Sequence, residues 1–124
     1  MAEKGLILEV KRASPSKGDI APNLDSYKTA FSYAESGAKA ISCLTEKNYF
    51  KGTLDDLMSV CRAIDDFEKE SSLPPPAVLR KDFLLSAKEI EISYRVGADA
   101  VLLIARILEK ETFLQMAKKV SELG

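Results

Sequence analysis

Carboxylate and amine side chains follow two short apolar segments of this sequence. In the segment LILEVK, residues 6–11, strand alternation places Glu9 and Lys11 on one face. In the segment LRKDF, residues 79–83, the same rule turns Lys81 away from its charged neighbours. Because α/β folds bind ligands at the carboxyl ends of their strands, these groups could contact a ligand and transfer protons. The alternative is a structural ion pair at one strand end and an exposed lysine at the other.

The composition narrows the chemistry that is open to this chain. It has 124 residues and no histidine, which excludes Ser-His-Asp catalysis, histidine metal ligands and imidazole acid–base catalysis. Acid–base work then falls to lysine, glutamate, aspartate or tyrosine. With 18 basic and 19 acidic residues the net charge is −1, which argues against a nucleic-acid partner.

Two segments that follow apolar runs are candidates for substrate contacts. Residues 12–18, RASPSKG, are rich in turn residues and hydrogen-bond donors, although they match neither the GxxxxGK[ST] nor the GxGxxG phosphate-binding pattern. We expect a loop that grips a substrate, with a solvated turn as the alternative. Residues 45–52 carry the pair Tyr49-Phe50, which could line an apolar pocket or pack the loop.

Four short apolar runs predict strands, and helical patterns lie between and after them. The predicted strands are residues 6–10, 40–44, 77–80 and 100–104. The predicted helices begin near residues 25, 53, 86 and 109 and end near residues 36, 70, 96 and 123. The prolines at 74–76 must end the second helix, since proline lacks the amide proton and restricts the residue before it.

An internal repeat indicates how these elements are arranged. Residues 36–44, SGAKAISCL, align without gaps on residues 96–104, VGADAVLLI. Each reads as a helix end, a glycine cap and a small-residue entry into a buried strand, so the chain repeats an αβ unit. Alternating strands and helices predict parallel strands with helical crossovers, in either a small open α/β sheet or half of an eight-fold barrel.

The remaining features predict an intracellular protein in one domain. Cys43 and Cys61 lie in apolar segments without CxxC spacing, and we expect reduced core residues. The apolar run at 6–10 is broken by Glu9, which argues against a secretory signal. The longest apolar stretch, residues 100–105, is too short to span a bilayer, so we expect a cytoplasmic protein without a membrane partner.

Four ordered segments of the chain resemble the indole-3-glycerol phosphate synthase family. They are EVKRASPSKG at residues 9–18, ISCLTE with YFKG at 41–46 and 49–52, LRKDF at 79–83, and GADAVLLI at 97–104. The resemblance implies a TIM (β/α)8-barrel enzyme of tryptophan biosynthesis. Such an enzyme closes and decarboxylates 1-(2-carboxyphenylamino)-1-deoxyribulose 5-phosphate to indole-3-glycerol phosphate, releasing carbon dioxide and water.

The resemblance also implies roles for particular residues. Lys81 is the general acid that protonates the substrate's carbonyl oxygen as the ring closes. Lys11 is the second catalytic lysine, near the phosphate and hydroxyls, and Glu9 orients Lys11 and the substrate. The implied substrate-binding residues are Ser14 and Pro15 in a contacting loop, with Phe50, Phe83 and Leu102 as the apolar wall against the anthranilate ring. The family uses neither a metal nor an organic cofactor, and its partner is a phosphorylated small molecule.

The resemblance covers the first half of a barrel. We therefore expect residues 1–124 to form one partial domain of four βα units. The family's glutamate general base and glycine-rich phosphate site belong to strands 5–8, so we expect the isolated chain to be inactive. The alternative function is a non-catalytic half-barrel scaffold that associates with itself or with a complementing half. Its inner face would expose Ile7, Leu44, Leu79 and Leu102.

Overall fold

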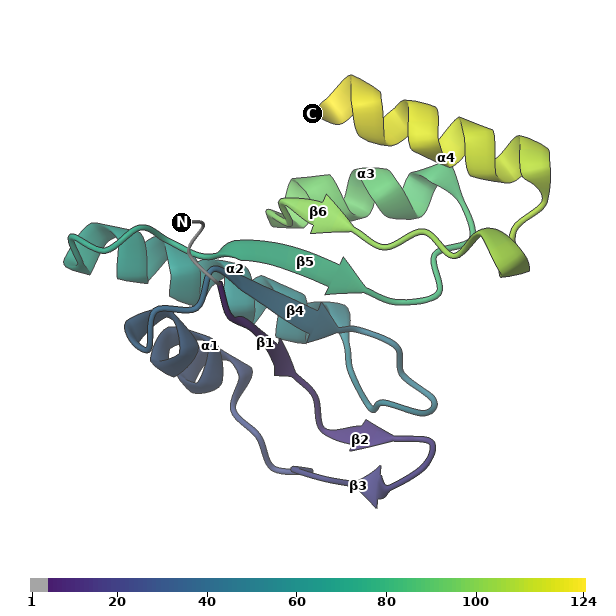
Figure 1. Ribbon diagram of the computed structural model, residues 1–124. Helices are drawn as coiled ribbons and strands as arrows, with labels where there is room; N and C mark the ends of the chain where they lie inside the picture. The colour runs from purple at the N-terminus through teal and green to yellow at the C-terminus, as the bar shows by residue number, and fades with distance from the viewer. Residues whose placement is uncertain (1–4) are drawn as a thin grey trace.

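A computed structural model describes residues 5–124 (Figure 1). Four strands form the main sheet, and a two-stranded hairpin follows the first of them. The strands are β1 (Ile7–Val10), β2 (Ala13–Ser14), β3 (Gly18–Asp19), β4 (Ala40–Leu44), β5 (Ala77–Lys81) and β6 (Ala100–Val101). The helices are α1 (Ser26–Glu35), α2 (Leu54–Glu70), α3 (Ala87–Val96) and α4 (Lys110–Leu123), with a 3₁₀ turn at Ala105–Ile107.

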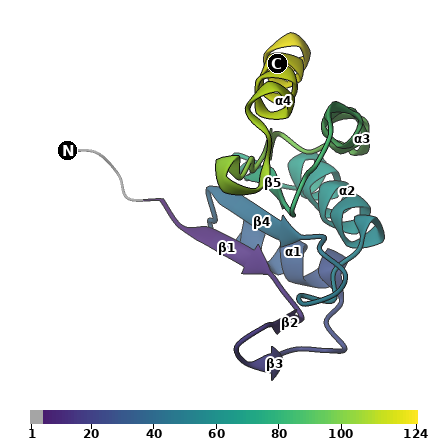
Figure 2. The same cartoon turned by 90° about the vertical axis from the view of Figure 1, so that its right-hand side faces the viewer.

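The order of the main sheet decides between the two predicted architectures. Its strands are all parallel and follow the order of the chain, β1-β4-β5-β6. Right-handed crossovers between successive strands put the connecting helices on one face, and α1, α2 and α3 lie together on one side of the sheet (Figure 2). A doubly wound sheet would reverse its order and carry helices on both faces. The described residues therefore form the first four βα units of a barrel-type winding, as expected.

The helix boundaries confirm the local sequence signals to within about a residue. Asp25 caps α1 by accepting from the Lys28 N–H at 3.0 Å. At α2, Thr53 and Asp56 form a reciprocal capping box, with bonds of 3.1 and 3.0 Å. The repeated connector is confirmed as well, because both of its glycines adopt the left-handed conformation, at φ values of 89° and 113°.

The core lies between the sheet and the helices. Leu57, Val60 and Phe67 of α2 pack in one cluster with Ile41 of β4 and Val78 of β5, and all five are at most 2% exposed. A smaller cluster joins α3 and α4. It consists of Leu84, Ile90 and Met116.

The opposite face of the sheet carries no helix among the described residues. Ile7 on this open face is 70% exposed and Leu102 is 37% exposed, in line with the predicted apolar inner face. Leu44 departs from that prediction, because it is only 4% exposed. It lies in β4, in the interior of the sheet, where its register partner is Lys81 of β5.

Two elements differ from the sequence prediction. The fourth strand is shorter than residues 100–104: after Val101, the Leu102 N–H donates to Arg80 O at 3.3 Å, and the backbone then turns away. No described strand pairs with its outer edge to keep it extended. The hairpin β2–β3 was not predicted, because strands of two residues leave no alternation to read. Its turn closes at Gly18, with a φ of 65°.

Cys43 and Cys61 are free thiols in the core, as expected. Burial raises the pKa of Cys43 to about 12 and that of Cys61 to about 11. In the described part of the chain, no helix has the length and apolar character needed to cross a membrane.

Candidate active site at the carboxyl ends of the strands

The open face of the sheet places its side chains in rows that run across the strands. The register pairs Glu9 of β1 with Ser42 of β4, so these two side chains are neighbours on one face. One row closer to the carboxyl ends, Leu44 pairs with Lys81 of β5. Lys11 follows β1 and by alternation joins this second row. The two lysines therefore flank a central leucine, and Glu9 lies one row behind them.

Glu9 joins both lysines into one charge cluster, defined here as Glu9, Lys11 and Lys81. Its Oε2 atom is 3.1 Å from Lys81 Nζ, and its Oε1 atom is 3.7 Å from Lys11 Nζ. The three side chains are between 28% and 42% exposed, so they are partly desolvated and still reachable from solvent. The structure thus brings together the three residues that the sequence nominated for catalysis.

Glu9 is held ionised in this cluster. Burial by itself would raise the pKa of the carboxyl group. A hydrogen bond from Ser42, the bond from Lys81 and the positive charges of Lys81 and Lys11 outweigh burial, so the pKa of Glu9 lies below its ordinary value. The cluster carries a net positive charge, which suits an anionic ligand.

The loop after β1 is anchored by Arg12 rather than left free. The guanidinium of Arg12 pairs with Asp56 and donates to Leu24 O at 2.8 Å and to Ser26 Oγ at 3.3 Å. Asp56 also accepts from Ser26 Oγ at 2.6 Å. These bonds tie the loop to the first turns of α1 and α2. Arg12 is therefore a structural residue of this loop.

The two predicted contact residues of that loop lie in and beside the hairpin. Ser14 belongs to β2, is 9% exposed and accepts from the Lys17 N–H at 3.2 Å. Pro15 is exposed at the start of the turn. Ser14 thus shapes the turn, and Pro15 offers the accessible surface.

The loop after β4 is organised by a residue that sequence reasoning passed over. Glu46 is 7% exposed, and its carboxylate accepts from the N–H groups of Asn48, Tyr49 and Phe50 at 2.8, 2.8 and 3.0 Å. Burial opposes its ionisation, but these three backbone bonds prevail and lower the pKa of Glu46. A carboxylate directly after a buried strand was the available signal. We define residues 46–52 as the clamped loop.

The clamped loop closes tightly on the strand before it. The Gly52 N–H donates to Glu46 O at 2.8 Å, and a β-carbon at Gly52 would lie 2.0 Å from Leu44 O. No larger residue fits there without moving the backbone. Lys51 adopts a φ of 55° and forms an ion pair with Asp19 of the hairpin. The two loops at this end of the sheet are thereby in contact.

The structure does not gather the three predicted apolar residues into one cavity. Phe50 is half-buried in the clamped loop, while Phe83 is 46% exposed and Leu102 is 37% exposed. Phe83 borders an open groove of about 490 Å³ between the clamped loop and the loop after β5. Leu102 continues the row of Lys81 across the sheet, since its N–H bonds to the residue before Lys81.

Arg80, the neighbour of Lys81, points to the helix side and is fully engaged there. Only 4% of its side chain is exposed, and it donates to Ser93 Oγ at 2.9 Å, to Thr45 Oγ1 at 3.1 Å and to Glu89 at 3.1 Å. Strand alternation thus places the side chain of Arg80 on the helix side, where it is structural, and that of the adjacent Lys81 on the open face, in the candidate site.

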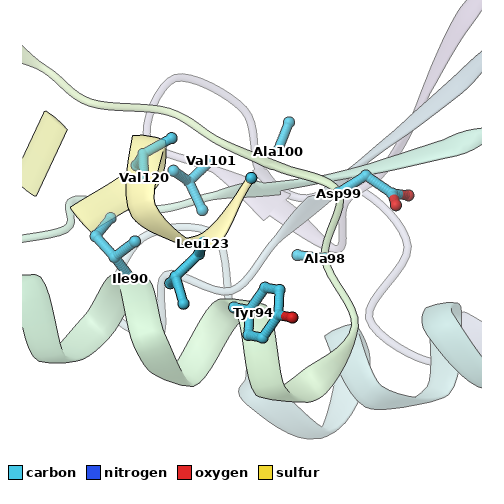
Figure 3. Close-up of a pocket in the computed structure, with 9 residues that line it drawn as sticks. Ile90, Tyr94, Ala98, Asp99, Ala100, Val101, Val120 and Leu123 are labelled. Carbon is cyan, nitrogen blue, oxygen red and sulfur yellow. The ribbon is translucent and has the colours of Figure 1, made fainter. Parts of the chain in front are cut away.

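A separate apolar cavity of about 160 Å³ lies at the other end of the sheet. It is bounded by α3, α4 and the amino end of β6, where apolar side chains such as Ile90, Val120 and Leu123 gather, while the carboxylate of Asp99 points away (Figure 3). The Asp99 carboxylate accepts from the Val78 N–H at 2.8 Å, which is a structural bond. In barrel-type folds the amino-terminal face serves stability, so this cavity is not a candidate active site. Residues 5–124 contain no group of three histidine, cysteine, aspartate or glutamate side chains arranged to hold a metal ion.

Comparison with known proteins finds one family. The family model described as indole-3-glycerol phosphate synthase matches residues 1–124. The indole-3-glycerol phosphate synthase of Exiguobacterium sibiricum is 46% identical over 107 residues, and that of Geobacillus kaustophilus is 43% identical over 120 residues. The multifunctional tryptophan biosynthesis protein of Schizosaccharomyces pombe is 41% identical over 123 residues.

These similarities cover most of this chain but less than half of each relative. The aligned part is 86% of this chain and 38% of the Exiguobacterium protein, and 97% of this chain and 43% of the Geobacillus protein. For the multifunctional Schizosaccharomyces protein the shares are 99% and 16%.

Proposed function

The chain belongs to the indole-3-glycerol phosphate synthase family, and we propose that its charge cluster serves the reaction of that family. The reaction closes the pyrrole ring of 1-(2-carboxyphenylamino)-1-deoxyribulose 5-phosphate, with loss of carbon dioxide and water, to give indole-3-glycerol phosphate. The single observation that carries this proposal is the bridge from Glu9 to both Lys11 and Lys81 at the carboxyl ends of two parallel strands.

The substrate carries a carboxylate and a phosphate, and two lysines beside one glutamate offer it a net positive site. In the proposed reaction, Lys81 leaves Glu9 and donates a proton to the substrate's carbonyl oxygen while the new carbon–carbon bond forms. A positioned general acid of this kind contributes about 10²–10⁴-fold to the rate. Lys11 holds the phosphate and hydroxyl part of the substrate, and Glu9 orients Lys11.

The remaining site residues are proposed to bind the substrate. Pro15 contacts the substrate from the tip of the hairpin. Ser14 stabilises the turn of that hairpin and also faces the substrate. Phe50, Phe83 and Leu102 provide an apolar wall for the anthranilate ring. Their partial exposure leaves apolar surface for that purpose.

Substitution of the two lysines tests these roles. The assay follows formation of indole-3-glycerol phosphate by this chain together with a fragment that supplies strands 5–8 of a relative. Lys81→Met should abolish kcat while largely sparing KM, because a general acid acts mainly in the transition state. Lys11→Met should impair both parameters. Lys88→Met, at an exposed position of α3, is the matched control and should change neither.

If the kcat of Lys81→Met stayed within about threefold of that of the unsubstituted protein, Lys81 would not be the general acid. That ratio corresponds to only ~0.7 kcal/mol at RT ≈ 0.59 kcal/mol. The acid would then have to be Lys11. The 124-residue chain assayed alone should form no measurable product, and turnover at an ordinary enzymatic rate would contradict that expectation.

A second candidate function is self-association of the 124-residue chain. The observation that favours it is the open face, where Ile7 is 70% exposed beside strand edges that no described strand covers. Such surfaces drive association, so light scattering at micromolar concentration should show a dimer or larger species. Ile7→Lys should weaken this association more than Leu114→Lys, a control at an exposed position of α4. A monodisperse monomer would refute the idea.

A further inference from the structure

Ser42 is a buried hydroxyl in the middle of an apolar strand. It lies in β4 between Ile41 and Cys43, on the open face, and is 5% exposed. A polar group that is this well buried is destabilising unless it is hydrogen-bonded. Its bond is to the charge cluster, because Ser42 Oγ donates to Glu9 Oε2 at 2.8 Å. The roles proposed above do not use this residue.

We propose that Ser42 is a positioning residue that holds the Glu9 carboxylate in place independently of the lysines. Oε2 of Glu9 accepts from both Ser42 Oγ and Lys81 Nζ, at 2.8 and 3.1 Å. A general acid must exchange its partner for the substrate oxygen during the reaction. Without the Ser42 hydroxyl, Oε2 of Glu9 would then lose both of its donors, and only the 3.7 Å ion pair of Oε1 with Lys11 would hold the carboxylate. The Ser42 hydroxyl belongs to the central strand pair and does not move with Lys81.

The placement of this hydroxyl is determined by the sheet rather than by a loop. Ser42 and Glu9 are direct partners in the β1–β4 register, so the backbone sets the distance between their side chains. Because the Ser42 hydroxyl is fixed on a rigid strand, its short hydrogen bond restricts the rotamers that the Glu9 side chain can adopt. Glu9 then keeps its position relative to Lys11 through the catalytic cycle.

The electrostatics agree with this geometry. The charged groups that face the Glu9 carboxylate are Lys11 after β1 and Lys81 on β5, and β4 contributes the uncharged Ser42. Burial raises the pKa of Glu9, and the Ser42 bond is the largest of the effects that lower it. Removing the hydroxyl should therefore leave a carboxylate that protonates at higher pH than in the unsubstituted chain.

Titration of the Glu9 carboxyl carbon by ¹³C NMR in the 124-residue chain tests the proposal directly. Ser42→Ala should shift the Glu9 titration midpoint upward, and Ser42→Thr, which restores a hydroxyl, should return it toward the original value. Ser93→Ala is the matched control, because Ser93 is a buried serine as well but bonds to Arg80 and Glu89 on the helix side. It should leave the Glu9 midpoint unchanged.

An unchanged Glu9 midpoint in Ser42→Ala, or an equal shift in Ser93→Ala, would overturn the proposal. If Ser42→Ala does not fold, Ser42→Cys tests the same point, since it replaces the hydroxyl by a similar-sized but poor donor. In the complemented enzyme, Ser42→Ala should lower kcat by about tenfold or more with a smaller change in KM, and Ser42→Thr should restore it. This kinetic test rests on the proposed function, whereas the NMR titration does not. Failure of the Ser42 proposal can therefore be distinguished from failure of the proposed function.

Discussion

Removing one member of the partly buried ion pair between Arg12 and Asp56 should cost a large part of the stability of this chain. Asp56 receives the guanidinium of Arg12, the Ser26 hydroxyl at 2.6 Å and the Thr53 N–H at 3.0 Å. Its side chain is only 9% exposed, and that of Arg12 is 21% exposed. The substitution Asp56→Ala removes all three bonds and leaves a partly buried guanidinium without its carboxylate.

The structure allows the magnitude to be worked out. Breaking a fully buried pair by removing one partner costs about 3–5 kcal/mol, and loss of a helix cap costs about 1 kcal/mol. Arg12 keeps two other acceptors and some contact with water, which places the pair at the low end of its range. We therefore expect Asp56→Ala to lower the free energy of unfolding by about 3 kcal/mol. With a urea m-value of about 1.5 kcal/mol/M, the midpoint would fall by about 2 M.

Urea unfolding followed by circular dichroism measures this loss, and Asp55→Ala is the control. Asp55 stands in the same first turn of α2 but is exposed, so its contribution is limited to the helix dipole, about 0.3–1 kcal/mol. A loss for Asp56→Ala no larger than that for Asp55→Ala would refute the assignment of Arg12 and Asp56 to a structural pair.

The difference in the free energy of unfolding between the unsubstituted chain and Asp56→Ala should depend on pH, which provides a second check. Burial raises the pKa of Asp56, but its bonds to Arg12 and Ser26 outweigh burial, and the folded value lies below the ordinary one. A depressed folded pKa gives stability that is complete above the unfolded value, about 4. That stability is lost as the pH falls through the folded value. The gap between the unsubstituted chain and Asp56→Ala should therefore narrow on acidification below about pH 4.

Two further outcomes follow from the loops and the core. Glu46→Gln replaces a carboxylate that accepts three backbone hydrogen bonds by an amide with only one acceptor oxygen. Hydrogen exchange of the backbone amides at 48–50 should therefore become at least several-fold faster. The core amides of α2 should keep their exchange rates. Unchanged exchange at 48–50 would contradict the clamp. Because burial raises their pKa values to about 12 and about 11, Cys43 and Cys61 should resist thiol reagents at pH 8 until the chain unfolds in urea, and rapid modification of the folded chain would show that they are not buried.

Local signals in the sequence were sufficient for most of the secondary structure. Capping residues and glycines depend on neighbours a few positions away, so Asp25, Thr53 and the glycines at 37 and 97 marked the helix ends correctly. The hairpin at 13–19 and the early end of β6 were missed, because two-residue strands have no periodicity and the length of β6 depends on what pairs with its outer edge.

For the candidate site too, the sequence predicted some residues and missed others. Alternation within single strands and the family resemblance were enough to nominate Glu9, Lys11 and Lys81, and the structure brings them together. The roles of Ser42 and Glu46 were not visible in the sequence. A serine within an apolar strand and a glutamate at its end have many possible partners, and nothing local to them selects one.

The sequence by itself determined the order of the elements, the repeated αβ unit and the family of this chain. Only the tertiary structure decided that the sheet winds in one direction, which partners engage Arg80 on the helix side, and that Glu9 shares its carboxylate between Ser42 and Lys81. The physical reason is distance along the chain. Glu9 lies 33 positions from Ser42 and 72 from Lys81, and only the register of three parallel strands brings such residues within hydrogen-bond distance.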